Sequence, residues 1–414
     1  MKINTVNKRK IFNDPIYGFI TLPNELIFDL IEHPFFQRLR RIKQLGLTGL
    51  VYPGALHTRF HHAMGAMHLL TQAIDTLRSK GIDISNEEAE GVTVAILLHD
   101  IGHGPFSHAL ENSIVSNISH EQISAIFMDK LNEEMNGKLS LAIRIFKNEY
   151  PKKFLYQLVS SQLDMDRLDY LKRDSFFTGV SEGIISSDRI IAMLSVANDS
   201  LAIEAKGIYS IEKFIIARRL MYWQVYLHKT VLSAEHLLVN ILSRAKELSA
   251  EGLELFSTPA LSLFLKNNFS YQDFLEKEEI LKAFSDLDDN DIFTSIKVWK
   301  DNKDKILSTL CECMVNRNLF RIELQNEPFS KAKKEALKNA AKEKYQLSEN
   351  EVGYFVYSDS IKNSAYNPAS ERISILYKDG STVDIADAAD QLNISVLSQT
   401  VEKFFLCYPK ELAV

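Results

Sequence analysis

Cysteine is scarce in this chain, which contains only Cys311, Cys313 and Cys407 among 414 residues. Three cysteines are too few for a disulfide framework, and their spacing lacks the paired CxxC pattern of a structural zinc site. We therefore expect Cys311 and Cys313 to be ordinary helix residues without redox or metal chemistry.

An excess of positive charge is also missing. Lys and Arg number 48 against 54 Asp and Glu, which gives a formal net charge of −6. This balance excludes a protein that coats nucleic acid through overall positive charge, although a local basic cleft stays compatible with it. Nucleic acid is therefore a partner that the composition allows but does not indicate, and any anion site must be local.

Long apolar runs are absent as well. No stretch of the sequence reaches the roughly 20 apolar residues that a membrane-spanning helix needs. After the basic start MKINTVNKRK, Asp14, Pro15 and Gly18 interrupt the apolar segment that a secretory signal peptide would require. We expect a cytoplasmic protein with no membrane partner.

Glycine and proline, at 16 and 10 residues, form no tract that would mark a linker, and no internal repeat is evident. A chain of 414 residues exceeds the length at which a single hydrophobic core usually stops growing, so we expect more than one lobe. The pattern favours a core at 1–250, a helical extension at 251–330 and a C-terminal α/β element at 331–414, with approximate boundaries.

Helical spacing of apolar residues is the main pattern in the first 250 residues. Ser85 with Glu88, and Ser119 with Gln122, have the spacing of a capping box, which predicts helices that begin just after each serine. Further helices are expected over 24–45 with a break at Pro34, 61–79, 157–173 and 210–249.

The last part of the chain differs in character. The segment SKAKKEALKNAAKEKYQ predicts a polar, lysine-rich helix, and residues 352–358, 371–377 and 381–385 are rich in strand-forming side chains. Lys378-Asp379-Gly380 is a turn signal between the last two of these segments. The fold class expected is mainly α, with a small C-terminal mixed α/β element.

Most of the eleven histidines fall between residues 57 and 108. Imidazole and carboxylate together form a mixed ligand set that suits a divalent ion with open, water-filled positions. His99 and Asp100 stand at a helix end, where Gly102 releases the regular geometry and both side chains can turn toward one ion. His62 and Asp166 are suitable in type as the remaining ligands. The plain alternative is a capping Asp beside a core His, and we assign His57, His61 and His68 to the core.

Four carboxylates lie between residues 164 and 174, and these could form the polar face of a surface helix. Asp166, Tyr170 and Asp174, however, follow one another at i, i+4 and i+8, which places them in one row. Met165 and Leu168 occupy a different face. A row of two carboxylates and a phenol beside so many apolar neighbours indicates a functional surface.

The pattern H…HD…D, filled by His62, His99-Asp100 and Asp166, resembles the HD superfamily of metal-dependent phosphohydrolases. The segments KIFNDPIYGFITL, HPFFQRLRRIKQLG, PGALHTRFHHAMG, HDIGHGPFSH and LDMDRLDYLKRD are similar, in order and spacing, to its deoxynucleoside-triphosphate triphosphohydrolase branch. The resemblance runs from about residue 10 to 245 and implies a helical HD-domain core.

The resemblance also implies a catalytic centre. One divalent ion, for which Fe, Mn, Co, Ni and Zn are candidates with additional Mg as a further one, would be held against the α-phosphate by His62, His99, Asp100 and Asp166. The further catalytic residues implied are His103, His108, Glu111 and His120. His108 would protonate the departing 5′-oxygen with support from Glu111, where the family more often has Asp.

Substrate contacts are implied for a second set of residues. Gln44 and Asp174 match residues on the 3′-hydroxyl, Tyr170 matches a ring that crowds the 2′ position, and Tyr226 matches another sugar-pocket residue. The phosphate-binding cations implied are Arg59, Arg167, Arg218 and Lys229, with Arg167 standing where a better-known member has Lys. Arg218, Tyr222 and Tyr226 share a helix face by spacing, and Lys229 follows at i+11.

A regulatory nucleotide pocket between subunits is implied for Lys10, Glu32, Gln37 and Arg40, with Glu in place of Asp at the base-reading position. The function expected is hydrolysis of a deoxynucleoside triphosphate to deoxynucleoside and tripolyphosphate by a homo-oligomer, a dimer or a tetramer. One alternative is a phosphatase of the same superfamily acting on a smaller ester such as a nucleoside monophosphate. Another is a nucleotide or nucleic-acid binding module with a structural metal.

Overall fold

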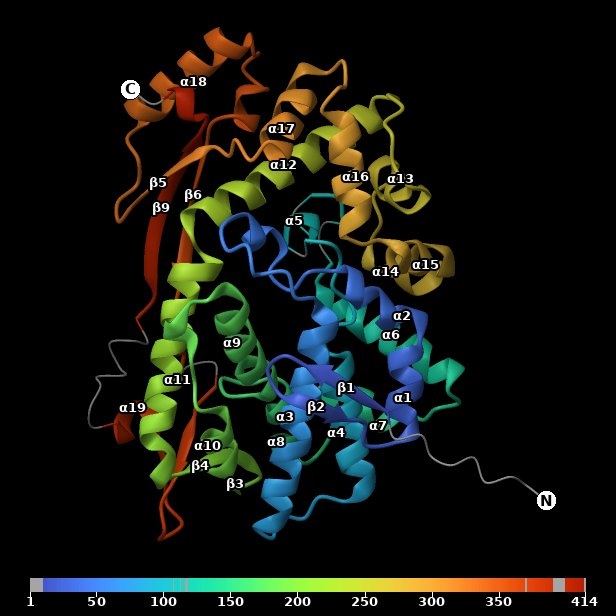
Figure 1. Cartoon of the computed structure of the whole chain (residues 1–414), viewed down its shortest axis with the longest axis vertical. Coiled ribbons are helices and arrows are strands. Elements are labelled where there is room, and N and C mark those ends of the chain that lie inside the picture. The colour runs from blue at the N-terminus through green and yellow to red at the C-terminus, as the bar shows by residue number, and fades with distance from the viewer. Residues whose placement is uncertain are drawn as a thin grey trace, which may run out of the picture.

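Helices predominate in the computed structural model of the chain (Figure 1), which confirms the mainly α fold class. The structure describes residues 10–106, 108–111, 113–115, 118–368, 371–389 and 399–412, and of His108 it describes the backbone alone. One contiguous set of buried apolar side chains extends from Ile20 to Leu412. The three-part division of the chain stays a prediction.

The helices follow one another through the whole described chain. Those of the first 250 residues are α1 (Glu25–Glu32), α2 (Pro34–Gln37), α3 (Arg59–Ser79), α4 (Asn86–Leu98), α5 (His108–Glu111), α6 (His120–Glu134), α7 (Ser140–Phe146), α8 (Lys153–Val159), α9 (Met165–Thr178), α10 (Ser187–Ala192), α11 (Ile208–Met221) and α12 (Lys229–Ala250). The later ones are α13 (Pro259–Lys266), α14 (Tyr271–Glu276), α15 (Glu278–Asp286), α16 (Asp289–Trp299), α17 (Lys305–Val315), α18 (Lys331–Tyr345) and α19 (Ile385–Ala388).

Strands form three small sheets. Their bounds are β1 (Ile11–Asp14), β2 (Gly18–Thr21), β3 (Leu194–Ala197), β4 (Ser200–Glu204), β5 (Arg321–Gln325), β6 (Tyr357–Asn363), β7 (Ser374–Leu376), β8 (Thr382–Asp384) and β9 (Val401–Tyr408). The sheet orders are β1-β2, β3-β4-β7-β8 and β5-β9-β6. All neighbours pair antiparallel except β4 and β7, which are parallel.

The helix α3 lies at the centre of the core and packs against α4 and α9. It is buried along most of its length, and small residues such as Ala63, Gly65 and Ala66 let the neighbouring helices approach. The predicted capping boxes are confirmed: Ser85 accepts from Glu88 N at the start of α4, and Ser119 accepts from Gln122 N at the start of α6. The break at Pro34 is confirmed between α1 and α2.

Several predicted elements have other bounds in the structure. The helix expected over 157–173 is two helices, because Asp164 ends the intervening loop and caps α9 by accepting from Arg167 N. The helix expected over 210–249 is also two, because α11 passes into a π-helical turn, Tyr222–Tyr226, and α12 begins anew after His228. Residues 352–354 form a 3₁₀ turn rather than a strand.

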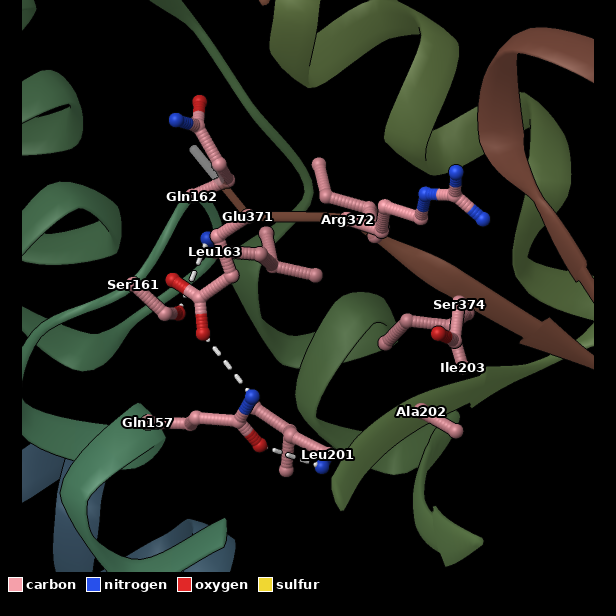
Figure 2. A pocket seen from close by; sticks show the side chains of 11 residues that line it. Gln157, Ser161, Gln162, Leu163, Leu201, Ala202, Ile203, Glu371, Arg372 and Ser374 are labelled. Atoms are coloured by element: carbon pink, nitrogen blue, oxygen red, sulfur yellow. Dashed lines mark hydrogen bonds between the residues drawn. The ribbon is translucent and has the colours of Figure 1, made fainter. Parts of the chain in front are cut away.

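The C-terminal segment 371–376 lies directly against the core (Figure 2). Glu371 accepts a hydrogen bond from Gln157 Nε2 at 2.8 Å, and Gln157 Oε1 accepts from Leu201 N at 2.7 Å. The predicted hairpin around Lys378-Asp379-Gly380 is confirmed as β7 and β8, with Gly380 at a φ of 86°. Among the described residues, no helix combines the length and apolar content that crossing a bilayer requires.

Candidate active site

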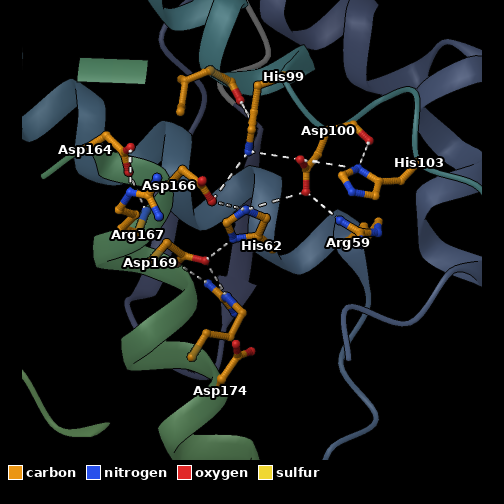
Figure 3. Close-up of polar contacts among 12 residues, drawn as sticks. Arg59, His62, His99, Asp100, His103, Asp164, Asp166, Arg167, Asp169 and Asp174 are labelled. Atoms are coloured by element: carbon orange, nitrogen blue, oxygen red, sulfur yellow. Dashed lines mark hydrogen bonds and ion pairs between the residues drawn. The ribbon is translucent and has the colours of Figure 1, made fainter. Parts of the chain in front are cut away.

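Two histidines and one aspartate from three helices converge on one point (Figure 3). His62 lies in the first turn of α3, His99 ends α4, and Asp166 lies in the first turn of α9. Asp166 Oδ1 is 3.0 Å from His62 Nε2 and 3.6 Å from His99 Nε2. One potential ligand atom from each residue lies within 4.8 Å of the others, which is the spacing of a group that can hold a metal ion.

The protonation of the two rings fits a metal. His99 Nδ1 must donate to Ile96 O, 2.6 Å away, because a carbonyl oxygen can only accept. His62 Nδ1 donates in the same way to Asp169 Oδ2 at 2.8 Å. Both Nε2 atoms are buried, lack a hydrogen-bond partner in the described structure and face Asp166 at 3.0 and 3.6 Å. Although burial alone would lower the pKa of His62, Asp166 and Asp169 raise it to about 10, so this position favours a cation, either a proton or a metal ion. A divalent cation is the partner that such a donor set suits.

Asp100 lies beside this group and also contacts Arg59 and His103. Its Oδ2 accepts from Arg59 Nη1 at 2.6 Å, while its Oδ1 is 3.4 Å from His99 Nε2 and 3.3 Å from His103 Nδ1. Burial by itself would raise the pKa of Asp100, but His103, His99 and Arg59 outweigh burial and hold it well below its usual range. Its role as fourth ligand stays a prediction, because the group that converges within 4.8 Å consists of the other three.

A buried chain of charges supports His62 from behind. Asp169, which accepts from His62, is held by Arg173 through Nε at 2.9 Å and Nη2 at 3.0 Å. Arg173 Nη1 then reaches Asp14 Oδ2 at 2.8 Å, at the end of β1. A side chain at residue 65 would collide with this pair, since a Cβ there would lie 2.0 Å from Asp169 Oδ1. Gly65 therefore makes room for the carboxylate that orients the candidate ligand.

The predicted acid–base residues lie on the other side of Asp100. The rings of His103 and His120 stack with centroids 3.8 Å apart, and His120 Nδ1 is 3.0 Å from Glu111 Oε1. Burial, followed by the charge of Arg59, lowers the pKa of His103 well below its usual range, so this imidazole is neutral at neutral pH. The side chain of His108 lies outside the described structure, and its role stays a prediction.

The predicted sugar-binding residues gather around Asp174. Tyr226 donates to Asp174 Oδ2 at 2.7 Å, and the Tyr170 ring lies edge-on to the Tyr226 ring with centroids 6.1 Å apart. The π-helical turn that ends at Tyr226 gives this tyrosine its position, and such turns are frequent at functional sites. Gln44 is linked to this cluster because its backbone N–H donates to His57 O. The side-chain oxygen of Gln44 is buried without a hydrogen-bond partner in the described structure.

The predicted phosphate-binding cations lie in three places, of which the contact of Arg59 with Asp100 is one. Arg167 donates to Ser161 O at 2.5 Å and Arg218 donates to Gln162 Oε1 at 3.0 Å, so one loop holds both guanidinium groups. Lys229 instead begins α12 and lines a separate hollow with Arg321 of β5. Contrary to the prediction from spacing, Lys229 does not share a helix face with Arg218, because α11 ends between the two residues. The phosphate contact of Lys229 stays a prediction.

The four residues predicted for a regulatory pocket lie close together at the surface. Lys10 Nζ is 3.8 Å from Glu32 Oε1, and Arg40 donates from Nε to Gln37 Oε1 at 2.9 Å. These pairs show that the residues are neighbours in one chain. Their binding of a nucleotide stays a prediction.

Sequence reasoning missed three residues that the structure places in the site. His57, which we assigned to the core, is buried and lies 2.8 Å from Asp174 Oδ1 through Nε2. Asp169 and Arg173 were not singled out as a pair, although their i, i+4 spacing on a helix is a signal for an ion pair. The contact of His57 joins residues 117 positions apart, and no local pattern could have indicated it.

Comparisons with known proteins agree with this geometry. A family model described as HD domain matches residues 59–174, and a model described as HD associated region matches residues 185–273. The first range includes the four predicted ligands, His62, His99, Asp100 and Asp166. Protein YwfO of Bacillus subtilis is 36% identical over 323 residues, covering 76% of this chain and 72% of that protein.

A protein of Dictyostelium discoideum named deoxynucleoside triphosphate triphosphohydrolase SAMHD1 homolog is 32% identical over 257 residues, covering 58% of this chain and 50% of that protein. The crystal structure of a phosphohydrolase from Bacteroides thetaiotaomicron matches with a TM-score of 0.94 and 56% identity, covering 97% of this chain and 100% of that chain. This likeness extends through the HD motif and the parts that follow it. The chain therefore belongs to the HD-domain phosphohydrolase family.

Proposed function

We propose that the protein hydrolyses deoxynucleoside triphosphates to deoxynucleoside and tripolyphosphate. The observation that carries this proposal is the position of Tyr170 on α9. One helical turn before it stands Asp166 of the metal group, and one turn after it stands Asp174 with Tyr226. Burial raises the pKa of the Tyr170 phenol, and the nearby charges of Arg167 and Arg218 oppose this rise. Arginine side chains and a polar cluster of Asp174, Tyr226 and His57 thus adjoin one metal group.

The chain's own residues would bind and orient the substrate. Arg59, Arg167 and Arg218 offer forked donors for a triphosphate, which carries more charge and more oxygens than a monoester. A divalent ion held by His62, His99, Asp166 and, as the sequence predicts, Asp100 would supply Lewis-acid activation of phosphorus and of an attacking water. Fe, Mn, Co, Ni and Zn are the candidates for this ion, with Mg as an additional one.

Proton transfer would fall to the imidazoles beside Asp100. His103 is neutral, and Glu111 orients the ring of His120 through Nδ1. His108 follows the same turn and is our candidate for the group that protonates the departing 5′-oxygen. At the opposite end, His57 and Tyr226 hold Asp174, whose carboxylate would accept from the 3′-hydroxyl.

The name of the Dictyostelium relative supports a nucleotide substrate, and we propose a homo-oligomer, a dimer or a tetramer, as the active form. A second candidate function within the family is hydrolysis of a smaller ester such as a nucleoside monophosphate. The three arginines near the metal group favour the triphosphate over this alternative.

The test is a product analysis. The metal-loaded protein is incubated with a deoxynucleoside triphosphate, its ribonucleotide counterpart and a deoxynucleoside monophosphate, and products are read by chromatography and phosphorus NMR. Deoxynucleoside with tripolyphosphate supports the proposal. Orthophosphate with a diphosphate, or pyrophosphate with a monophosphate, rejects it, and turnover of the monophosphate alone favours the smaller ester. No turnover despite bound metal and nucleotide favours the binding module.

Discrimination against the ribonucleotide provides a second measurement. Tyr170→Ala should raise the relative rate on the ribonucleotide, because the ring crowds the 2′ position in this proposal. Tyr271→Ala is the matched control, since this tyrosine is 38% exposed on α14. Equal discrimination by the Tyr170→Ala variant and the unchanged protein would remove Tyr170 from the sugar pocket.

A further inference from the structure

Arg38 is a fully buried arginine beside the HD motif. It opens a short 3₁₀ segment, Arg38–Arg41, that follows α2. Its Nη1 donates to Ile101 O at 2.8 Å and its Nη2 donates to His103 O at 2.8 Å. Both acceptors belong to the turn that directly follows His99 and Asp100.

A buried guanidinium with carbonyl partners is an expensive arrangement, because the cation loses its hydration without gaining a full opposite charge. The Phe127 and Phe284 rings lie 5.7 and 5.2 Å from its central carbon and compensate in part. Burial lowers the pKa of Arg38 to about 9, which still leaves it protonated at neutral pH. Its two hydrogen bonds to the backbone of one turn therefore point to a geometric task.

The turn that Arg38 holds is also fixed by α6. Gly102 N donates to Ser124 Oγ at 2.9 Å, and Ser124 Oγ donates to His99 O at 2.8 Å. A Cβ at Gly102 would lie 2.2 Å from His120 O, so α6 packs tightly on the turn. Arg38 supplies two further hydrogen bonds, which hold the same turn to the segment Arg38–Arg41.

The residues after Arg38 contact the rest of the site. Ile42 O accepts from Arg59 N at 2.9 Å, and Gln44 N donates to His57 O at 3.0 Å. Arg59 binds Asp100 and His57 binds Asp174, as described above. Segment 38–44 is therefore in direct contact with both ends of the candidate site.

The helical extension holds this segment from outside. Asp288 pairs with Arg41, and Asp289 Oδ2 accepts from Lys43 N at 3.0 Å, just where α16 begins. Phe284 of α15 adds its ring to Arg38. These contacts join residues about 246 positions apart, so the helical extension is placed to stabilise this segment of the core.

We propose that Arg38 is a positioning residue that sets the geometry of the His99-Asp100-Gly102-His103 turn for metal binding, and that Phe284 and Asp288 of the helical extension hold it in place. The inference rests on the proposed function only where turnover is measured. Metal affinity can be measured without any assumption about the substrate. Groups that orient metal ligands typically contribute 10–100-fold to metal affinity or activity.

The experiment compares Arg38→Lys with Arg78→Lys in the full-length protein. Arg78 is a matched control, since it also donates to two carbonyls, Ile84 O at 2.9 Å and Ser85 O at 2.8 Å, at the far end of α3. Affinity for Mn²⁺ alone is measured by electron paramagnetic resonance, and thermal unfolding is followed without metal. We expect Arg38→Lys to weaken Mn²⁺ binding by about 10–100-fold, while Arg78→Lys stays within about twofold.

Mn²⁺ affinity of Arg38→Lys equal to that of the unchanged protein would overturn the proposal. If Arg38→Lys does not fold, Phe284→Leu keeps the arginine and removes a ring from it, and we expect a smaller Mn²⁺ defect in the same direction. Unchanged affinity in Phe284→Leu would then overturn the proposal. If the unchanged protein binds Mn²⁺ but turns over no nucleotide, the proposed function is rejected. The comparison of Mn²⁺ affinities between Arg38→Lys and Arg78→Lys remains valid in that case.

Discussion

Arg173 in the core and Lys362 on the C-terminal sheet both pair with carboxylates, but the first pair is buried and the second is exposed to solvent. Arg173 is fully buried and contacts Asp169 and Asp14. Lys362 on β6 lies 3.5 Å from Glu402 on β9, with 63% and 37% of the two side chains exposed. A buried pair incurs a large desolvation cost and becomes very sensitive to loss of one partner, whereas an exposed pair contributes little.

The burial of the charged residues indicates where the site lies better than their number does. In the core, the buried charges converge: Asp169 contacts His62, and Asp100 contacts Arg59. On the C-terminal element, the lysine-rich helix α18 buries Leu337 and Ala341 while its lysines stay at the surface. The same residue types thus orient candidate ligands in one region and interact with solvent in the other.

The largest effect that would test this comparison is the loss of Asp166. Asp166→Ala removes a member of the metal group, and we expect metal content near background and turnover reduced by at least about 10³-fold, since metal catalysis contributes several kcal/mol. The helices bury their own apolar faces, so circular dichroism should change little. Asp188→Ala, at a carboxylate that is 84% exposed, is the control. Full metal content and turnover in Asp166→Ala would contradict the site.

The second effect concerns stability. Arg173→Met leaves Asp169 and Asp14 as buried carboxylates without their cation, and we expect the free energy of unfolding to fall by about 3–5 kcal/mol. Urea denaturation of the metal-free protein measures it. Arg144→Met, at an exposed arginine on α7, should change stability far less. Equal losses in the two variants would show that burial does not distinguish the two kinds of charge.

A smaller effect is expected where a side chain is added. Gly65→Ala places a Cβ 2.2 Å from Arg173 Nη2, so the ion pair must shift, and overpacking of this kind costs about 1–3 kcal/mol. Mn²⁺ affinity should fall as well, because Asp169 orients His62. Gly353→Ala is the matched control, since no heavy atom lies within 4 Å of its added Cβ. Unchanged stability of Gly65→Ala would mean that the Asp169–Arg173 pair can move aside for the added Cβ at little cost.

Local patterns predicted the parts of the fold that local physics determines. The capping boxes at Ser85 and Ser119 and the break at Pro34 depend on neighbouring residues, and all three are present. The breaks before α9 and α12 were missed, because apolar spacing continues across Asp164 and His228 although both cap a new helix. The Asn198-Asp199 turn, with both residues at positive φ, was a readable hairpin signal that we did not use.

For the candidate site, too, the sequence indicated the central residues but not the contacts that position them. The motif indicated His62, His99 and Asp166, and these three converge. The contacts that position them could not be predicted from spacing, because Arg38 reaches Ile101 and His57 reaches Asp174 across long stretches of chain. Buried polar contacts of this kind depend on how helices pack, which the order of residues along one helix does not specify.

The smallest effect should come from the exposed pair itself. Lys362→Met removes the cation beside Glu402, and we expect the free energy of unfolding to change by less than about 0.5 kcal/mol, because solvent screens both charges and the ordering of two long side chains offsets the gain. Urea denaturation at low and at high salt measures it. Glu402→Gln is the reciprocal variant and should behave alike. A loss of about 2 kcal/mol or more in either variant would bring the exposed pair close to Arg173 and would end the distinction between the two regions.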